Sequence, residues 1–151
     1  MELSVEAELV LRAAGWERGR GIDISEWRSH FSANGIQLHD SAARFLSEFG
    51  GLSVDSSSGG GAPEPFELDP SLAYGEEDRF IDWSEVIGHS LYPLGELDGG
   101  RFFLGIDEVG RIYLVANWIA CYGTIPEGLE NLIRGVAPKE LYGRQKIDPP
   151  D

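Results

Sequence analysis

The side chains that most often carry catalysis or bind metals are few and widely spaced in this sequence. The histidines are His30, His39 and His89, and Cys121 is the only cysteine. None of the histidines has the close spacing of a zinc site. A cysteine with only a distant histidine is more commonly a small apolar residue than a nucleophile. The sequence therefore predicts neither a metal site nor a cofactor site.

Two adjacent carboxylates, Asp107 and Glu108, form a pair that could act in acid–base catalysis. Paired carboxylates transfer protons when one pocket holds both of them. Here they precede Gly110 in a predicted hairpin turn, where carboxylates more commonly accept hydrogen bonds from backbone amides and face water. A small acidic hydrolase is therefore the less favoured interpretation. It predicts a pocket that holds both carboxylates, with the pKa of one of them raised.

The charge of the chain is strongly unbalanced. It has 26 Asp and Glu against 12 Lys and Arg, which gives a formal net charge of −14. Residues 64–85 hold eight of these acids and one base, Arg79, and so contribute −7. Nucleic acid and membrane surfaces are disfavoured as ligands because both are recognised by basic surfaces. A basic protein partner fits, and an acidic surface that only maintains solubility is the competing explanation.

Length and composition indicate one soluble domain. A chain of 151 residues with 42% hydrophobic residues is large enough for one core. A single cysteine excludes an internal disulfide and is typical of a reducing compartment. The N-terminus has no basic and apolar leader, and no run reaches the ~20 apolar residues that span a membrane. We therefore expect a cytoplasmic protein.

The stretch from 91 to 116 predicts an antiparallel meander. Three apolar runs, Leu91–Leu97, Arg101–Ile106 and Arg111–Ala116, are separated by two glycine-containing turns, Asp98–Gly100 and Asp107–Gly110. Alternating apolar residues indicate strands, and short glycine-rich gaps indicate hairpins. We expect a curved sheet with helices packed on it.

Helical periodicity and capping residues predict the flanking helices. The first helix follows Ser4 and ends at Gly15, the second follows Asp23 and ends at Asn34, and the third runs from about Asp40 to Gly50. A fourth includes Phe80–Ile87, and a fifth begins at Thr124. Short strands are expected at Leu52–Val54 and Phe66–Leu68, a turn of helix at Pro70–Ala73, and a flexible loop tip at 56–61. The sequence thus predicts one α+β domain over residues 1–136, followed by a polar, flexible tail over 137–151.

Several motifs together resemble one known family. They are GWERGR at 15–20, Trp27, AARFLSEFGGL at 42–52, Asp69-Pro70, Gly75-Glu76, LYPLGE at 91–96, LGIDEVGRIYLV at 104–115, and Tyr122-Gly123. Over residues 9–135 the chain resembles the SUKH superfamily, and within it the third SUKH immunity-protein group. The resemblance implies a non-enzymatic α+β protein of a bacterial polymorphic toxin system, which binds and neutralises a toxin that is often a nuclease or another nucleic-acid-directed enzyme. Some members of the superfamily have other binding roles, so a scaffold or regulator with the same fold is an alternative.

Neither catalytic nor partner-contacting residues transfer from the family by motif, so the candidate docking residues come from charge. A toxin that acts on nucleic acid needs a basic cleft, which an acidic surface complements. We expect a monomer or a weak homodimer, because exposed strand edges permit pairing. The candidate docking acids are Glu76, Glu77, Asp78 and Asp82, with Glu96, Asp98, Asp107 and Glu108 on the meander turns, and the candidate aromatic anchors are Trp118 and Tyr74.

Overall fold

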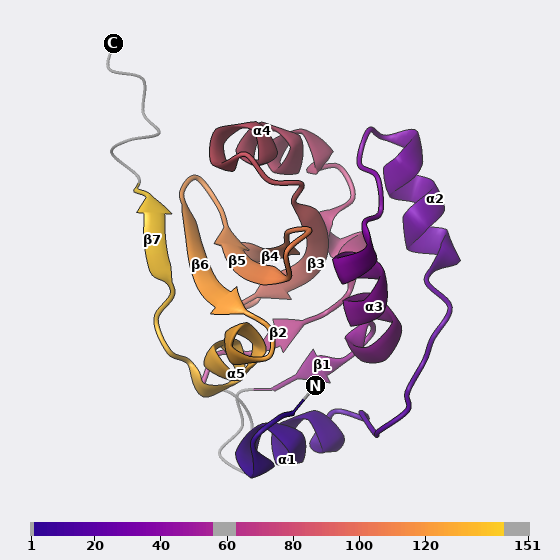
Figure 1. Ribbon diagram of the computed structural model, residues 1–151, viewed down its shortest axis with the longest axis vertical. Helices are drawn as coiled ribbons and strands as arrows, with labels where there is room; N and C mark the ends of the chain where they lie inside the picture. Colours follow the sequence, from indigo (N-terminus) through magenta and orange to yellow (C-terminus); the bar gives the residue numbers. More distant parts are fainter. Residues whose placement is uncertain (1, 56–62, 144–151) are drawn as a thin grey trace.

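The computed structural model describes residues 2–55 and 63–143, which contain five α-helices, one 3-10 helix and a seven-stranded sheet (Figure 1). The predicted α+β fold is confirmed. The loop tip expected at 56–61 lies outside the described residues. The elements in chain order are α1 (Val5–Ala13), α2 (Ser25–Ala33), α3 (Asp40–Phe49), β1 (Ser53–Val54), β2 (Phe66–Glu67), η1 (Pro70–Ala73), α4 (Glu77–Ile87), β3 (Tyr92–Leu97), β4 (Phe102–Ile106), β5 (Arg111–Val115), β6 (Ile119–Thr124), α5 (Glu127–Arg134) and β7 (Lys139–Tyr142).

The sheet is a continuous antiparallel meander in which each strand pairs with the next one in sequence. The predicted strands β3, β4 and β5 lie at its centre, where Leu104 is opposite Leu114 and Gly105 is opposite Tyr113. Figure 1 shows the curvature of the sheet and the helices gathered around it. Short turns join β3 to β4, β4 to β5 and β5 to β6, and the glycine-rich gaps predicted the first two of these hairpins. The β2–β3 connection instead contains η1 and α4, and the β6–β7 connection contains α5.

Alternation along the strands gives the sheet two apolar faces. Phe80 of α4 packs against Phe103 with ring centroids 6.0 Å apart, and a side chain at Gly105 would press against Phe80. The intervening Leu104 therefore points to the opposite face, where it is fully buried. Because both faces are covered, even the strand residues near α4 are largely buried.

The C-terminal part of the chain differs from the sequence expectation in two places. Thr124, expected to cap the last helix, ends β6, and α5 begins at Glu127 after Pro126. Residues Lys139–Tyr142, expected in a flexible tail, form the edge strand β7, which pairs with β6. All four residues of β7 are exposed, so the strand is held by backbone pairing and has no apolar alternation by which the sequence could reveal it.

The close approach of α5 to β6 depends on two glycines. Gly128 lies on the side of α5 that faces the sheet, and a Cβ atom there would lie 2.1 Å from the backbone oxygen of Gly123. Only a residue without a side chain lets the helix backbone approach the strand this closely.

We predict that Gly128→Ala destabilises the protein by about 1–3 kcal/mol, because the methyl group must push α5 away from β6. Helix propensity alone predicts the opposite, a gain of about 1 kcal/mol. Urea unfolding measures the difference. The control Ser29→Ala, at an exposed position of α2, should be neutral or slightly stabilising, and a Gly128→Ala variant as stable as this control would contradict the predicted contact.

Candidate partner-binding surface

Helix α4 carries the densest acidic segment, and two aromatic side chains fix it on the sheet. Phe80 and Trp83 are buried beneath the helix, and the Trp83 indole N–H donates a hydrogen bond to the Ala116 carbonyl at 2.9 Å. The helix ends at Gly88, which has the left-handed conformation (φ 73°) that favours glycine. The buried face thus fixes which acidic side chains face outward.

Two of the predicted docking acids are occupied by contacts within the protein. Glu76 pairs with Arg79 at 2.9 Å. Glu77 accepts hydrogen bonds from His30 of α2 at 2.9 Å and from the backbone N–H of Gly75, and only 12% of its side chain is exposed. Burial alone would raise the pKa of Glu77, but the hydrogen bonds from His30 and from backbone amides outweigh it and hold the pKa below its usual value. Glu77 therefore joins α4 to α2.

Three other acids of α4 form what we term the acidic ridge: Asp78, Asp82 and Glu85. All three are exposed, and among the described residues they have neither a hydrogen-bonding nor an ion-pair partner. Their spacing of four and three residues places them on one side of the helix. Asp78 and Asp82 were predicted docking residues. Glu85 was missed, although its spacing from Asp82 could have identified it.

Asp107, by contrast, was wrongly assigned to the docking surface. Its side chain is fully buried and lies at the centre of the β4–β5 turn. The carboxylate is satisfied internally, because a buried charge must be paired and hydrogen-bonded, and it cannot contact a partner. Burial and the hydrogen bond to Asp107 raise the pKa of Tyr113. The donors to Asp107 are the backbone N–H groups of Val109, Gly110 and Arg111 at 2.9–3.0 Å, Arg111 Nε at 2.8 Å and the Tyr113 hydroxyl at 2.7 Å.

The neighbouring Glu108 lies in a different environment. It is exposed and accepts hydrogen bonds from His89 Nδ1 and from the backbone N–H of Ser90, each at 2.8 Å. It lines a cavity of about 420 Å³ between α4 and the segment after α2, and Asp107 is not part of that lining. Burial would raise the pKa of Glu108, but the hydrogen bond from His89 outweighs it, so the pKa is lowered. The two carboxylates therefore do not share this pocket, as the hydrolase interpretation requires, and the pKa of Glu108 is shifted down and not up.

The acids on the β3–β4 hairpin lie apart from α4. Glu96 is half-buried on β3 beside Glu67 of β2, and burial followed by repulsion from Glu67 and Asp69 raises its pKa. Asp98 pairs with Arg101 in the turn at 3.3 Å. Figure 1 shows β2 well separated from α4. The structure thus divides the predicted acidic surface into two regions.

The two candidate aromatic anchors differ in accessibility. Tyr74, immediately before α4, is 36% exposed, and its ring stacks on His30 with centroids 3.5 Å apart. Trp118, in the β5–β6 turn, is partly buried and packs edge-on against Phe102 at 5.9 Å. Trp83, which lies within the predicted helical segment Phe80–Ile87, lines a second hollow of about 450 Å³ beside α4. Helical spacing shows that a tryptophan faces the sheet, but it does not show whether part of the ring borders a surface hollow.

Neither a metal cluster nor a membrane span is found in the part of the chain that the structure describes. No group of three His, Cys, Asp or Glu side chains is arranged to hold a metal ion within residues 2–55 and 63–143. Within the same ranges, no helix is both long and apolar enough to cross a bilayer.

An antiparallel sheet covered by helices, with an acidic ridge and an adjoining hollow beside α4, defines a small acidic α+β protein. The model of the SUKH-3 immunity protein family matches residues 3–135. The chain therefore belongs to the SUKH-3 immunity protein family, as its motifs indicated. Membership supports the role of an immunity protein and implies binding to a cognate toxin protein. No curated protein and no solved structure gives a significant match.

We predict that Asp107→Asn destabilises the protein by about 3–5 kcal/mol, because the amide cannot accept every hydrogen bond that the buried carboxylate accepts and leaves Arg111 without its counter-charge. Urea unfolding at neutral pH measures this loss. The matched control is Asp98→Asn, which makes the same chemical change in an exposed turn and should cost less than about 0.5 kcal/mol. Equal losses in the two variants would contradict the central role of Asp107.

We predict that Glu77→Gln lowers the free energy of unfolding by about 1 kcal/mol above pH 4.5 and by less in more acidic solution. The pKa of Glu77 is lowered in the folded protein from a usual value of 4.5. The ionised carboxylate therefore stabilises the fold above pH 4.5, and this contribution is lost as the pH falls through the folded pKa. Urea unfolding at several pH values follows the difference between the variant and the wild type. The matched control is Glu85→Gln, on the exposed ridge, which should change the free energy of unfolding by less than about 0.5 kcal/mol at neutral pH.

Proposed function

We propose that the protein binds and neutralises the cognate toxin of a bacterial polymorphic toxin system, and that the toxin is a nuclease or another nucleic-acid-directed enzyme with a basic cleft. The protein acts in the cytoplasm as a monomer or weak homodimer, as a binding protein and not as a catalyst. Its acidic ridge docks on the basic surface of the toxin and thereby blocks access of nucleic acid. Membership of an immunity-protein family and the charge of the ridge support this function.

The observation that carries the proposal is the lack of internal partners at the ridge. Asp78, Asp82 and Glu85 lie on one helix, and their side chains have no partner among the described residues, whereas Glu76 and Glu77 are paired. Because the ridge charges are not balanced within the protein, their field extends into solvent and attracts a basic partner. A toxin that binds phosphates must itself carry such a basic surface.

The first test is binding to, and protection against, the product of the neighbouring toxin gene. We expect the wild-type protein to bind this product tightly and to restore the growth of cells that express it. A protein that neither binds nor protects would overturn the immunity proposal and favour the alternative, a scaffold or regulator with the same fold and other partners.

We further predict that neutralising the ridge slows association. The triple variant Asp78→Asn, Asp82→Asn, Glu85→Gln should lower the association rate constant by about tenfold at low salt, because it removes the attraction that steers encounter. The salt dependence of that rate should become flatter. Stopped-flow mixing with the toxin at several salt concentrations measures both quantities.

A matched control separates the ridge from net charge. Glu6→Gln, Glu17→Gln and Glu127→Gln remove three exposed acids of α1, the following loop and α5, and so change the net charge equally. We expect this control to retain most of the association rate. A control that is slowed as much as the ridge variant would show that net charge, and not the ridge, steers the toxin.

A further inference from the structure

A groove runs along one side of α4, next to the acidic ridge. Its volume is about 450 Å³. The helix contributes residues from successive turns, and the turn between β5 and β6 forms the opposite wall. The lining residues are Glu76, which precedes α4, then Arg79, Asp82, Trp83 and Val86 of α4, and Ala116 and Asn117 of the turn.

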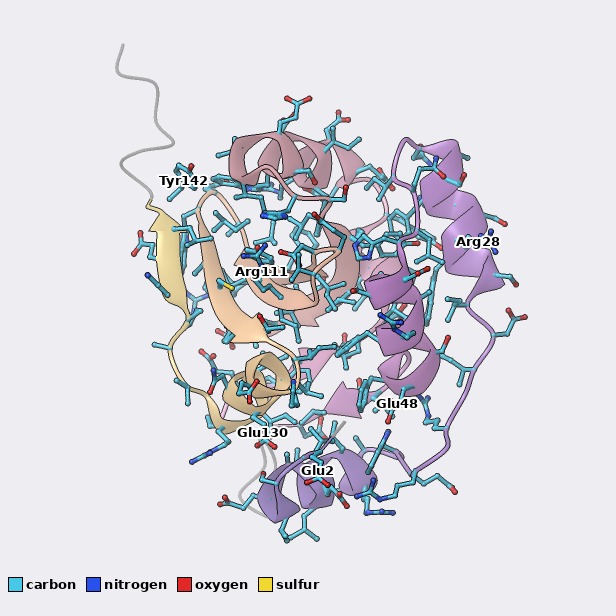
Figure 2. All side chains as sticks on the ribbon, in the orientation of Figure 1. Glu2, Arg28, Glu48, Arg111, Glu130 and Tyr142 are labelled. Carbon is cyan, nitrogen blue, oxygen red and sulfur yellow. The ribbon has the colours of Figure 1, made fainter. Side chains whose placement is uncertain are left out.

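The floor of this groove is apolar and held in place. The ring of Trp83 is fixed by its hydrogen bond to the Ala116 carbonyl, and Tyr142 at the end of β7 lies 6.2 Å from it, centroid to centroid. Figure 2 shows Tyr142 beside α4. Val86 is 49% exposed and Tyr142 is 37% exposed. Exposed apolar surface next to a buried tryptophan is typical of a site that binds another protein.

The rim of the groove is left with a negative charge. Its one cationic side chain, Arg79, is already engaged, since it bonds to Glu76 at 2.9 Å and to the Asn117 side-chain oxygen at 3.2 Å. Asp82 has no partner within the residues described. The groove thus combines an apolar floor with an unpaired carboxylate, which suits a side chain that is apolar along its length and cationic at its end.

We propose that the groove receives a basic segment of the toxin, in which an arginine or lysine lays its aliphatic stem on Trp83 and Val86 and places its charge at Asp82. This inference rests on the proposed function and specifies the partner chemistry at one part of the surface. A second copy of this chain is a poorer occupant, because each copy has a net charge of −14 and the ridge borders the groove. An acidic ligand is disfavoured for the same reason.

The decisive variant is Val86→Arg, which places a cationic side chain of the chain itself in the groove. We expect it to weaken toxin binding by at least about tenfold, because it fills the apolar floor and neutralises Asp82. The matched control is Val5→Arg, the same substitution at a position of α1 that is 77% exposed, which should change binding by less than about twofold. Titration calorimetry with the toxin measures both, after circular dichroism has confirmed folding.

The outcomes distinguish the groove from the immunity role. A wild-type protein that fails to bind the toxin overturns the proposed function. A wild-type protein that binds, with Val86→Arg and Val5→Arg equally unaffected, overturns only the groove assignment. If the wild-type protein sediments as a dimer that Val86→Arg dissociates, the occupant is a second copy and the assignment is also overturned.

A second measurement does not need the toxin. The full chain labelled with ¹⁵N is titrated with acetyl-Leu-Arg-Leu-amide and, separately, with acetyl-Leu-Glu-Leu-amide. We expect the indole N–H signal of Trp83 to shift with the arginine peptide and not with the glutamate peptide, while the signal of Trp16, whose indole bonds to Glu48, stays in place. No shift at Trp83, or equal shifts with both peptides, would overturn the proposed preference for a cationic segment.

Discussion

The buried carboxylate of Asp107 is the interaction on which the arrangement of the binding surface depends. It satisfies three backbone amides of the β4–β5 turn and also binds Arg111. The guanidinium of Arg111 then donates to His89 at 2.8 Å, and His89 in turn donates to Glu108 of the same turn. Because His89 directly follows the C-terminus of α4, one turn of the sheet fixes the end of the helix that presents the acidic ridge. Removing the carboxylate would therefore release both the turn and the segment that leads from α4 into β3.

The acidic residues of α4 have different roles, depending on whether their side chains are covered or exposed. A carboxylate in the interior must be neutralised by donors, or its desolvation destabilises the fold. Glu77, which is mostly covered, accordingly pairs with His30 and contributes to stability. The exposed acids of the ridge keep their hydration and need no such partner, which is why we propose them as the docking residues. The net charge of −14 is thus an incomplete guide to binding, since only the charges that the fold leaves unpaired act at a distance.

Structural features that follow from local sequence periodicity were predicted correctly. Features that depend on contacts between distant residues were not. Apolar spacing identified α3, and glycine-rich gaps identified the β3–β5 meander, because helices and hairpins follow from neighbours a few residues apart. The backbone donors to Asp107 lie two to four residues away and were expected for a carboxylate in a turn. Its burial was missed because it depends on distant residues that cover the turn, such as Ser41 of α3, whose hydroxyl donates to the Glu108 carbonyl. Strand β7 was missed because exposed residues held by backbone pairing have no hydrophobic pattern. The groove was missed because the helical spacing that places Trp83 at the sheet does not show whether the adjoining turn encloses it.

In the proposed complex with a toxin, the ridge and the groove would act on different steps of association. Attraction from the ridge extends over roughly a Debye length, about 8 Å at physiological salt, and therefore raises the rate of encounter without fixing a single orientation. Burial of a side chain on Trp83 and Val86 requires contact and shape, so it acts after encounter and governs how long the complex lasts. The two features adjoin along α4 and share Asp82, so a cationic group attracted by the ridge arrives at the rim of the groove. Because the Trp83 hydrogen bond fixes α4 on the sheet and the network from Asp107 through His89 ties down its C-terminal end, the proposed binding mode would need little ordering of the helix, and more of the interaction free energy would be retained as affinity.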